Sequence, residues 1–186
     1  MSLILASASP RRAELLDTAG FTFTVQTAEV DESTLPDEAP APYVLRVARA
    51  KAEAVSRRCG QRGNVVLAAD TTVVAGDQIL GKPEGRDDAI RMLTMLSGIV
   101  HDVYTGVVVV SDAGTLEDVV RTRVRLLPLE RGDIQWYVDS GEPDGKAGAY
   151  AIQGRASRFI DWIEGSWSNV VGLPVATVHQ MLKRIS

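Results

Sequence analysis

Residues 65–72, Val-Val-Leu-Ala-Ala-Asp-Thr-Thr, form a continuous apolar run that is followed at once by an acidic residue and two threonines. Such a run is typical of a strand covered on both faces, as in the parallel sheets of α/β proteins. Open α/β sheets bind their ligands at the carboxyl ends of these strands. The stretch therefore predicts an α/β fold in which Asp70 ends a buried strand beside a ligand site.

The rest of the chain alternates strand-like and helix-like segments around this run. Further strands are expected at residues 3–6, 21–25, 103–110 and 116–127. Helices are expected at residues 11–19, 43–58, 89–97, 130–138 and 175–185. Gly76-Asp77 separates residues 72–75 from 78–80 and indicates a tight hairpin. This order predicts a mixed, twisted sheet with flanking helices.

Two of the predicted helices carry more specific expectations. Apolar residues recur at helical spacing in 43–58, at Tyr43, Val47, Ala50 and Ala54, with basic residues between them. Solvation is the favoured interpretation of Lys51 on this helix, and a phosphate-binding cation is the alternative. Asp87 or Asp88 is the expected N-cap of helix 89–97.

Length, charge and cysteine content set limits on the protein. The 186 residues, 45% of them apolar, fit a single domain over 1–186 that buries its own core. The one cysteine, Cys59, excludes an intramolecular disulfide and argues against a thiolate zinc site. A net charge of −4 argues against a nucleic-acid partner. Since neither a signal peptide nor a run of about 20 apolar residues is seen, we expect a soluble cytoplasmic protein with no membrane partner.

The segment Ser7-Ala8-Ser9-Pro10-Arg11-Arg12 has the features of an anion site. Ser9 suits a helix N-cap and Pro10 the first helical position, so the turn directs backbone N–H groups at one point. Two hydroxyls and two guanidinium groups would add donors suited to phosphate, those of Ser7, Ser9, Arg11 and Arg12. A capped surface helix with solvated arginines is the alternative.

Asp70 is the main candidate for a functional carboxylate. Burying it is costly unless a metal, a cation or a hydrogen-bond donor stabilises it. Glu32, which follows Asp31, could converge on Asp70 to hold Mg²⁺ or Mn²⁺, since both ions favour carboxylate and water ligands. The alternatives are an Asx turn between Asp70 and Thr72, and a solvated acidic turn at residues 31–32.

Residues 76–83, Gly-Asp-Gln-Ile-Leu-Gly-Lys-Pro, nearly match a phosphate-binding P-loop. Pro83, however, stands where the Mg²⁺-binding hydroxyl belongs, and the segment has the pattern of a hairpin rather than of a strand, loop and helix. We therefore reject a P-loop. Lys82 remains a candidate phosphate ligand, because the following proline restricts it to an extended conformation.

Residues 146–154, Lys-Ala-Gly-Ala-Tyr-Ala-Ile-Gln-Gly, combine small residues with one amide. Small residues let the backbone approach a ligand closely, and Gln153 carries both a donor and an acceptor that could read the edge of a base. A glycine-rich turn packed on the sheet is the alternative. Trp162 and Trp167 could line a base pocket, although packing against the sheet is their favoured use.

Absent motifs narrow the chemistry further. His101 and His179 are the only histidines and form no metal-ligand pattern, so a zinc enzyme is not expected. The chain has no Gly-x-Ser-x-Gly motif for a hydrolase triad. The candidate residues named above would place three or four cations opposite two or three carboxylates. A polyphosphate substrate that binds with a divalent metal requires such a combination of charges.

Taken together, the motifs resemble those of the Maf-like nucleoside triphosphate pyrophosphatase family. The matching segments run in order over nearly the whole chain, at 5–12 with 14–16, 30–32, 48–52, 69–71, 81–83, 96–98 with His101, 142–143, 146–154 and 171–174. Each motif is weak alone, whereas nine in order are highly specific. The chain departs from the family pattern at Gly145, where many relatives carry Asp, and at Ala69, where many carry Gly.

The resemblance implies two lobes around a central cleft, as in inosine triphosphate pyrophosphatases, and a homodimer. It also implies metal-dependent hydrolysis of a nucleoside triphosphate to the monophosphate and pyrophosphate. By the same resemblance, Asp70 is the general base and, with Glu32, a carboxylate that binds the metal or the water. The implied phosphate ligands are Arg11, Arg12, Lys51 and Lys82, with hydroxyls from Ser7 or Ser9, and the residues associated with substrate choice are Thr71, Gln153 and Arg11 or Arg12.

The sequence of residues 147–154 resembles the corresponding motif of the subgroup that acts on dTTP and UTP. We therefore expect a dTTP/UTP pyrophosphatase that removes unwanted nucleotides from the cellular pool. The alternatives are a 7-methyl-GTP pyrophosphatase and a non-catalytic nucleotide-binding regulator of cell division. In such a regulator, Asp70 and Glu32 would be a costly surplus of negative charge beside a triphosphate.

Overall fold

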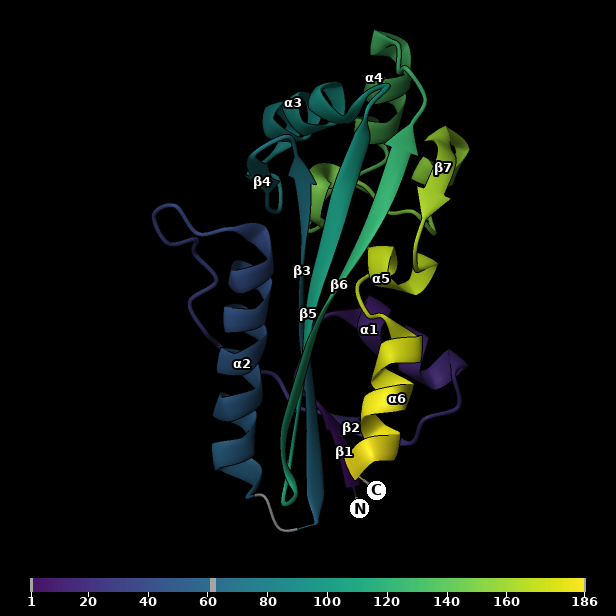
Figure 1. The fold of residues 1–186 in the computed structure, drawn as a ribbon. Helices are drawn as coiled ribbons and strands as arrows, with labels where there is room; N and C mark the ends of the chain where they lie inside the picture. Colours follow the sequence, from purple (N-terminus) through teal and green to yellow (C-terminus); the bar gives the residue numbers. More distant parts are fainter. Residues whose placement is uncertain (1, 61–62, 186) are drawn as a thin grey trace. The chain divides into compact units, whose positions relative to one another are not determined.

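The computed structural model describes residues 2–60 and 63–185 and has the mixed α/β architecture expected from the sequence (Figure 1). Its strands are β1 (Ser2–Leu5), β2 (Phe23–Val25), β3 (Asn64–Ala75), β4 (Gln78–Leu80), β5 (Val100–Ser111), β6 (Gly114–Leu126) and β7 (Ile160–Glu164). Its α-helices are α1 (Pro10–Thr18), α2 (Pro40–Cys59), α3 (Arg86–Leu96), α4 (Arg131–Asp139), α5 (Trp167–Val171) and α6 (Val175–Ile185). Short 3₁₀ turns lie at Ala147–Ala149 and Arg155–Phe159.

Within the described residues, the strands pair into one sheet in the order β2-β1-β3-β5-β6-β7, with β4 paired to β3. β1 runs parallel to both β2 and β3, and its last pair with β3 joins Leu5 to Leu67. The β3–β4 and β6–β7 pairs are antiparallel. The sheet is therefore mixed, as predicted.

The chain forms two compact units. The first comprises Met1–Thr71, Thr105–Val120 and Gly172–Ser186, and the second comprises Thr72–Tyr104 and Arg121–Val171. β3, β5 and β6 each contribute residues to both units. Two lobes were expected from the family resemblance, and the cleft stays a prediction.

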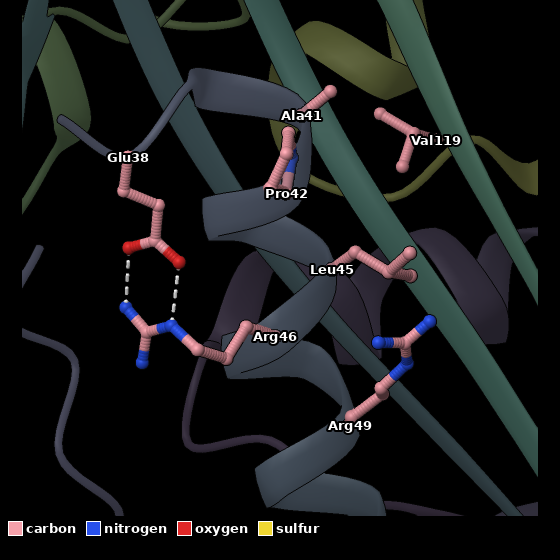
Figure 2. Close-up of a pocket in the computed structure, with 7 residues that line it drawn as sticks. All are labelled: Glu38, Ala41, Pro42, Leu45, Arg46, Arg49 and Val119. Atoms are coloured by element: carbon pink, nitrogen blue, oxygen red, sulfur yellow. Dashed lines mark hydrogen bonds and ion pairs between the residues drawn. The ribbon is translucent and has the colours of Figure 1, made fainter. Parts of the chain in front are cut away.

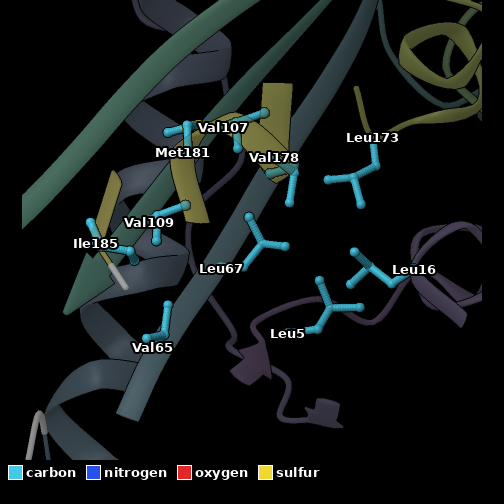
Figure 3. Close-up of a cluster of buried hydrophobic side chains, with 11 residues drawn as sticks. Leu5, Leu16, Val65, Leu67, Val107, Val109, Leu173, Val178, Met181 and Ile185 are labelled. Atoms are coloured by element: carbon cyan, nitrogen blue, oxygen red, sulfur yellow. The ribbon is translucent and has the colours of Figure 1, made fainter. Parts of the chain in front are cut away.

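The core of the first unit has two layers, one on each face of its strands. Neighbouring residues of β3 belong to different layers, because successive side chains of a strand point to opposite faces. Leu67 packs with Leu5 and Leu16 in the cluster completed by α6 (Figure 3). Val66 packs instead with Ala48 and other residues of α2. Accordingly, α2 covers one face, and α1 and α6 cover the other (Figure 1).

The second unit contains the β3–β4 hairpin and the helices α3, α4 and α5. Val73 pairs with Leu80, and Ala75 pairs with Gln78, so the hairpin predicted at Gly76-Asp77 is confirmed. Tyr137 of α4 is fully buried, at 0% exposure, and its ring meets Phe159 edge to face.

Two sequence predictions are wrong in detail. β3 does not end at Asp70 but continues to Ala75, because Thr71–Val74 are β-formers and β4 pairs with them from Val73 onward. α3 begins at Arg86 with Gly85 as its N-cap, which places Asp87 and Asp88 in the first turn. Asp88 still accepts the N–H of Glu84 at 3.1 Å.

No helix in residues 2–60 and 63–185 has both the length and the apolar character needed to cross a bilayer.

Candidate active site

Lys51, Asp70 and Glu32 meet in the first unit. The Nζ of Lys51 lies 2.7 Å from Oδ1 of Asp70 and 2.6 Å from Oε1 of Glu32. Lys51 and Asp70 are each only 7% exposed, whereas 40% of the Glu32 side chain is exposed. The prediction that Lys51 is solvated is therefore wrong. Glu32 and Asp70 share its ammonium group, which agrees with the possibility that Glu32 converges on Asp70 rather than with a solvated acidic turn.

The packing of α2 explains how a lysine comes to lie inside. The buried face of this helix consists of Val44, Val47, Ala48, Lys51, Ala52, Val55 and Ser56. β5 passes this face at Gly106, where a Cβ atom would lie only 2.6 Å from the carbonyl carbon and oxygen of Val44. Glycine at this position therefore permits the close approach of the helix and the strand on the face that carries Lys51.

Tyr43 joins this group of charges, although the sequence pattern indicated only an apolar contact. Its hydroxyl donates a hydrogen bond of 2.8 Å to the backbone oxygen of Glu32, which anchors the loop before α2. Burial, and then the negative charges of Asp70 and Glu32, raise the pKa of Tyr43 to about 12. The phenol therefore stays protonated and acts as a donor. Its position one turn before Val47 gave no signal for this contact.

Arg12 is a buried crosslink of the same unit. Its Nε donates to the carbonyl of Gly172 at 2.8 Å, and its terminal nitrogens donate to the hydroxyls of Ser7 and Thr71, both at 3.1 Å. Burial lowers its pKa from the ordinary value, and the charge of Asp70 opposes this shift. The guanidinium of Arg12 thus ties the turn before α1 to β3, directly beside Asp70.

Thr71 extends the network one residue beyond Asp70. Its hydroxyl lies 2.9 Å from that of Thr105 and 3.3 Å from the carbonyl of Gly172. Neither Thr105 nor Gly172 was singled out from the sequence as a site residue. Both are distant in sequence from Thr71, so no local pattern could have linked them to it.

Arg11 and Ser9 occupy the more open side of the turn before α1. Arg11 is half-buried, and burial lowers its pKa, whereas the nearby Glu14 raises it. Ser9 is the N-cap of α1, but its side chain makes no capping hydrogen bond, and its N–H donates to Oγ of Ser7 at 3.2 Å. Pro10 at the first helical position is confirmed. Arg11 is therefore the better placed of the two arginines to meet a ligand.

Lys82 and Gln153 belong to the second unit. Both side chains are exposed. The carbonyl of Gly81, next to Lys82, accepts the N–H of Gly148 at 3.1 Å, which fastens the end of the hairpin to the glycine-rich segment. Gly148 has φ of 67°, and a Cβ there would lie 2.9 Å from the side chain of Val73.

The two tryptophans weighed for a base pocket lie in the same unit. Trp162 lies under the guanidinium of Arg123, and 48% of Trp167 is exposed.

Glu32 and Asp70 of the first unit are two carboxylates that could take part in holding a divalent metal. Both Asp70 and Glu32 already contact a single cation, the ammonium of Lys51. In the described part of the chain, no group of three or more His, Cys, Asp or Glu residues is arranged to hold a metal. Mg²⁺ is commonly held by one or two carboxylates together with water and substrate phosphates. Glu32 and Asp70 would supply these carboxylates.

A groove of about 510 Å³ lies elsewhere on the first unit, along the N-terminal half of α2 (Figure 2). Its lining residues are Glu38, Ala41, Pro42, Leu45, Arg46, Arg49 and Val119. The guanidinium of Arg46 is paired with Glu38 at 2.6 Å, and that of Arg49 with Glu117 at 2.5 Å. None of the predicted site residues lines this groove, and we assign it no ligand.

Comparison with known proteins relates this arrangement to a family. The family model described as "Maf-like protein" matches residues 2–185. A dTTP/UTP pyrophosphatase of Anaeromyxobacter dehalogenans (strain 2CP-C) is 52% identical over 98% of this chain and 93% of its own length. One from Myxococcus xanthus (strain DK1622) is 52% identical over 98% of this chain and 91% of its own. The solved structure of a HAM1 protein from Coxiella burnetii shares the fold, with a TM-score of 0.52 at 13% identity and 99% coverage of both chains.

Proposed function

The chain belongs to the Maf-like protein family, and we propose that it is a nucleoside triphosphate pyrophosphatase that converts dTTP and UTP to the monophosphate and pyrophosphate. The names of relatives that are about half identical over nearly the full chain support this substrate choice. Removal of unwanted nucleotides from the cellular pool is the proposed role.

One observation carries the proposal, the buried Asp70 carboxylate held by Lys51 at 2.7 Å. Asp70 is 7% exposed, so the chain retains an acidic group where burial is costly. Such a group beside Arg12 and the hydroxyl of Thr71 suits a reaction that needs both a proton acceptor and bound phosphates. In a protein that only bound a metal-free triphosphate, two carboxylates beside the ligand would repel its phosphates.

In the proposed reaction, a water molecule attacks the α-phosphorus while the bond from that atom to the α,β-bridging oxygen breaks. Asp70 accepts the proton of the water, and pyrophosphate leaves. Lys51 fixes the orientation of the Asp70 carboxylate, and Arg12 fixes the Thr71 side chain next to it. Arg11 would offer its charge to the phosphates.

A divalent cation on Glu32 and Asp70 would make the water more acidic and neutralise the charge of the leaving pyrophosphate. Lys82 as a phosphate ligand and Gln153 as the group that reads the base remain predictions from the sequence.

Pyrophosphate release tests the proposal. We expect release from dTTP and UTP in the presence of Mg²⁺ or Mn²⁺, none after chelation, and recovery when the metal is returned. The panel should include CTP, ATP, GTP and 7-methyl-GTP. Preference for 7-methyl-GTP would overturn the substrate assignment, and binding without release from any nucleotide would instead indicate a regulator.

A further inference from the structure

Glu142 lies at the centre of a hydrogen-bond network in the second unit. Its Oε1 accepts the hydroxyl of Tyr137 at 2.8 Å and the N–H of Ala156 at 3.4 Å. Its Oε2 accepts the N–H of Arg155 at 3.0 Å. The carboxylate therefore holds two successive backbone N–H groups that directly follow Gly154.

Tyr137 holds the same loop from the other side. Its oxygen accepts the N–H of Ala151 at 3.1 Å, while its proton is donated to Glu142. Burial is the main cause that raises the pKa of this phenol above its ordinary value, and the hydrogen bond to Glu142 adds to the shift. The phenol is thus protonated and links Glu142 to the start of the loop. Residues 151–156 are fastened at both ends by one connected pair of side chains.

Gly154 shows how closely the carboxylate approaches the loop. A Cβ at this position would lie 2.5 Å from both carboxylate oxygens of Glu142. Ala151 and Ile152 are buried, at 5% and 6% exposure, whereas Gln153 between Ile152 and Gly154 is exposed. The loop is therefore fixed from within and presents one amide side chain outward.

We propose that Glu142 is a positioning residue that holds the loop carrying Gln153 and thereby sets the selectivity for the base. This inference rests on the proposed function, in which Gln153 reads the base. A side-chain amide discriminates between bases only if its donor and acceptor are fixed in place, because a mobile loop would let the amide move to match either base.

A comparison of UTP with CTP measures recognition of the base by Gln153 separately from binding of the sugar and the phosphates, which the two nucleotides share. Uracil presents an oxygen acceptor at position 4, whereas cytosine presents an amino donor there. The amide of Gln153 can offer its NH₂ group to the oxygen of uracil or, turned over, its own oxygen to the amino group of cytosine. In this proposal the fixed loop limits the positions from which the side chain reaches the base to those that favour uracil. Weakening the network should therefore reduce the preference for UTP over CTP.

The test is a double-mutant cycle of Glu142→Gln and Gln153→Ala. Glu142→Gln keeps the shape but replaces one acceptor oxygen with an NH₂ donor facing donors of the loop. The ratio of kcat/KM for UTP to that for CTP should fall by about tenfold, the effect of roughly one lost hydrogen bond, with kcat for UTP close to wild type. In the Gln153→Ala background, Glu142→Gln should leave the ratio unchanged. Glu164→Gln is the matched control, since Glu164 pairs with Arg123 and not with the loop.

Two results would overturn the inference. The first is an equal loss of kcat/KM for UTP and CTP in Glu142→Gln, and the second is a further fall of the ratio when Gln153 is already Ala. Hydrogen exchange of the ligand-free protein gives an independent readout, because the N–H groups of Arg155 and Ala156 should exchange faster in Glu142→Gln than in Glu164→Gln.

The proposed function can fail separately. If the wild-type chain hydrolyses no triphosphate, the UTP-to-CTP ratio of dissociation constants, measured by calorimetry, replaces the kinetic ratio in the same cycle. A ratio of dissociation constants that Glu142→Gln does not change would then reject the positioning role.

Discussion

Lys51 on α2 and Asp70 on β3 form a buried ion pair with 2.7 Å between Nζ and Oδ1, although 19 positions separate them in the chain. The same ammonium contacts Glu32 at 2.6 Å. One cation therefore stabilises both carboxylates that we propose for the reaction. Changes at Lys51 and at Asp70 should consequently differ in their effects on stability and on turnover.

Replacing Asp70 with Asn should abolish turnover and leave nucleotide binding largely intact. The amide keeps an oxygen for Lys51 but cannot take the proton of the water, so kcat should fall by at least about 100-fold. Pyrophosphate release and calorimetric binding of UTP measure the two effects. Asp102→Asn is the control, because Asp102 pairs with Arg121 on an exposed surface. Full activity of Asp70→Asn would refute the assignment.

Replacing Lys51 with Met should destabilise the protein strongly. The change leaves Asp70 charged and buried, so the free energy of unfolding should fall by about 3 kcal/mol or more. Urea denaturation at pH 7 measures it. Arg49→Met removes an exposed pair of the same helix, with Glu117, and should lose less than about 1 kcal/mol.

Combining Lys51→Met with Asp70→Asn should recover part of the loss, since the buried charge of Asp70 that lost its partner is then removed. Similar losses in Lys51→Met and Arg49→Met would show that the buried pair has no special importance.

The two adjacent arginines should separate into a structural and a ligand-binding residue. Arg12→Lys should lower the free energy of unfolding by about 2 kcal/mol, because one ammonium cannot replace the three directed hydrogen bonds to Gly172, Ser7 and Thr71. Arg11→Met should leave stability near wild type and raise KM for UTP about tenfold. Urea denaturation and steady-state kinetics of both variants test this, and identical profiles would contradict it.

His101 should make stability depend on pH between about 4 and 6.5. Burial lowers its pKa to about 4, and its Nε2 lies 2.8 Å from the hydroxyl of Tyr150. Between the two pKa values the unfolded chain binds a proton that the folded chain does not. The free energy of unfolding should therefore fall as pH drops from 6.5 to 4, by about 3 kcal/mol in total from this residue.

Urea denaturation at several pH values, comparing wild type with His101→Gln, measures the contribution of His101. His179→Gln is the control, because His179 is exposed. If His101→Gln retained the full pH dependence, the effect would belong to other groups.

Gly106→Ala should destabilise the first unit by at least about 2 kcal/mol, since the new methyl group would overlap the backbone of Val44 and Leu45. Thermal unfolding measures the effect. Gly132→Ala on α4 is the matched control. Nothing lies within 4 Å of a Cβ at that position, so this change should be neutral or slightly stabilising. Equal melting temperatures for the two variants would contradict this prediction, because they would mean that α2 and β5 can move slightly apart without a loss of stability.

Elements with strong local signals could be predicted from the sequence. α6 has the bounds Val175–Ile185 that its pattern predicted, and the β3–β4 hairpin follows from Gly76-Asp77. The end of β3 was misplaced, because an acidic residue after an apolar run resembles a strand end. The pairing partner that extends the strand, β4, follows later in the sequence.

The candidate site was only partly predictable. Tyr43, Val47, Ala50 and Ala54 formed the predicted face of α2, whereas the buried face includes Val44 and Val55 and contains Lys51. Because alanines lie on both sides of the helix, the sequence did not determine which face of α2 is buried. Burial of Lys51 becomes favourable only through Asp70, which is distant in the sequence. The buried role of Arg12 depends likewise on Gly172 and Thr71, far away in the chain.

The sharing of β3, β5 and β6 has a consequence for the history of the gene. The first unit consists of three separate stretches of chain and the second of two. No single crossover could therefore exchange one unit for that of another protein without interrupting a strand that both require. We therefore expect descendants of this chain to inherit the two units together.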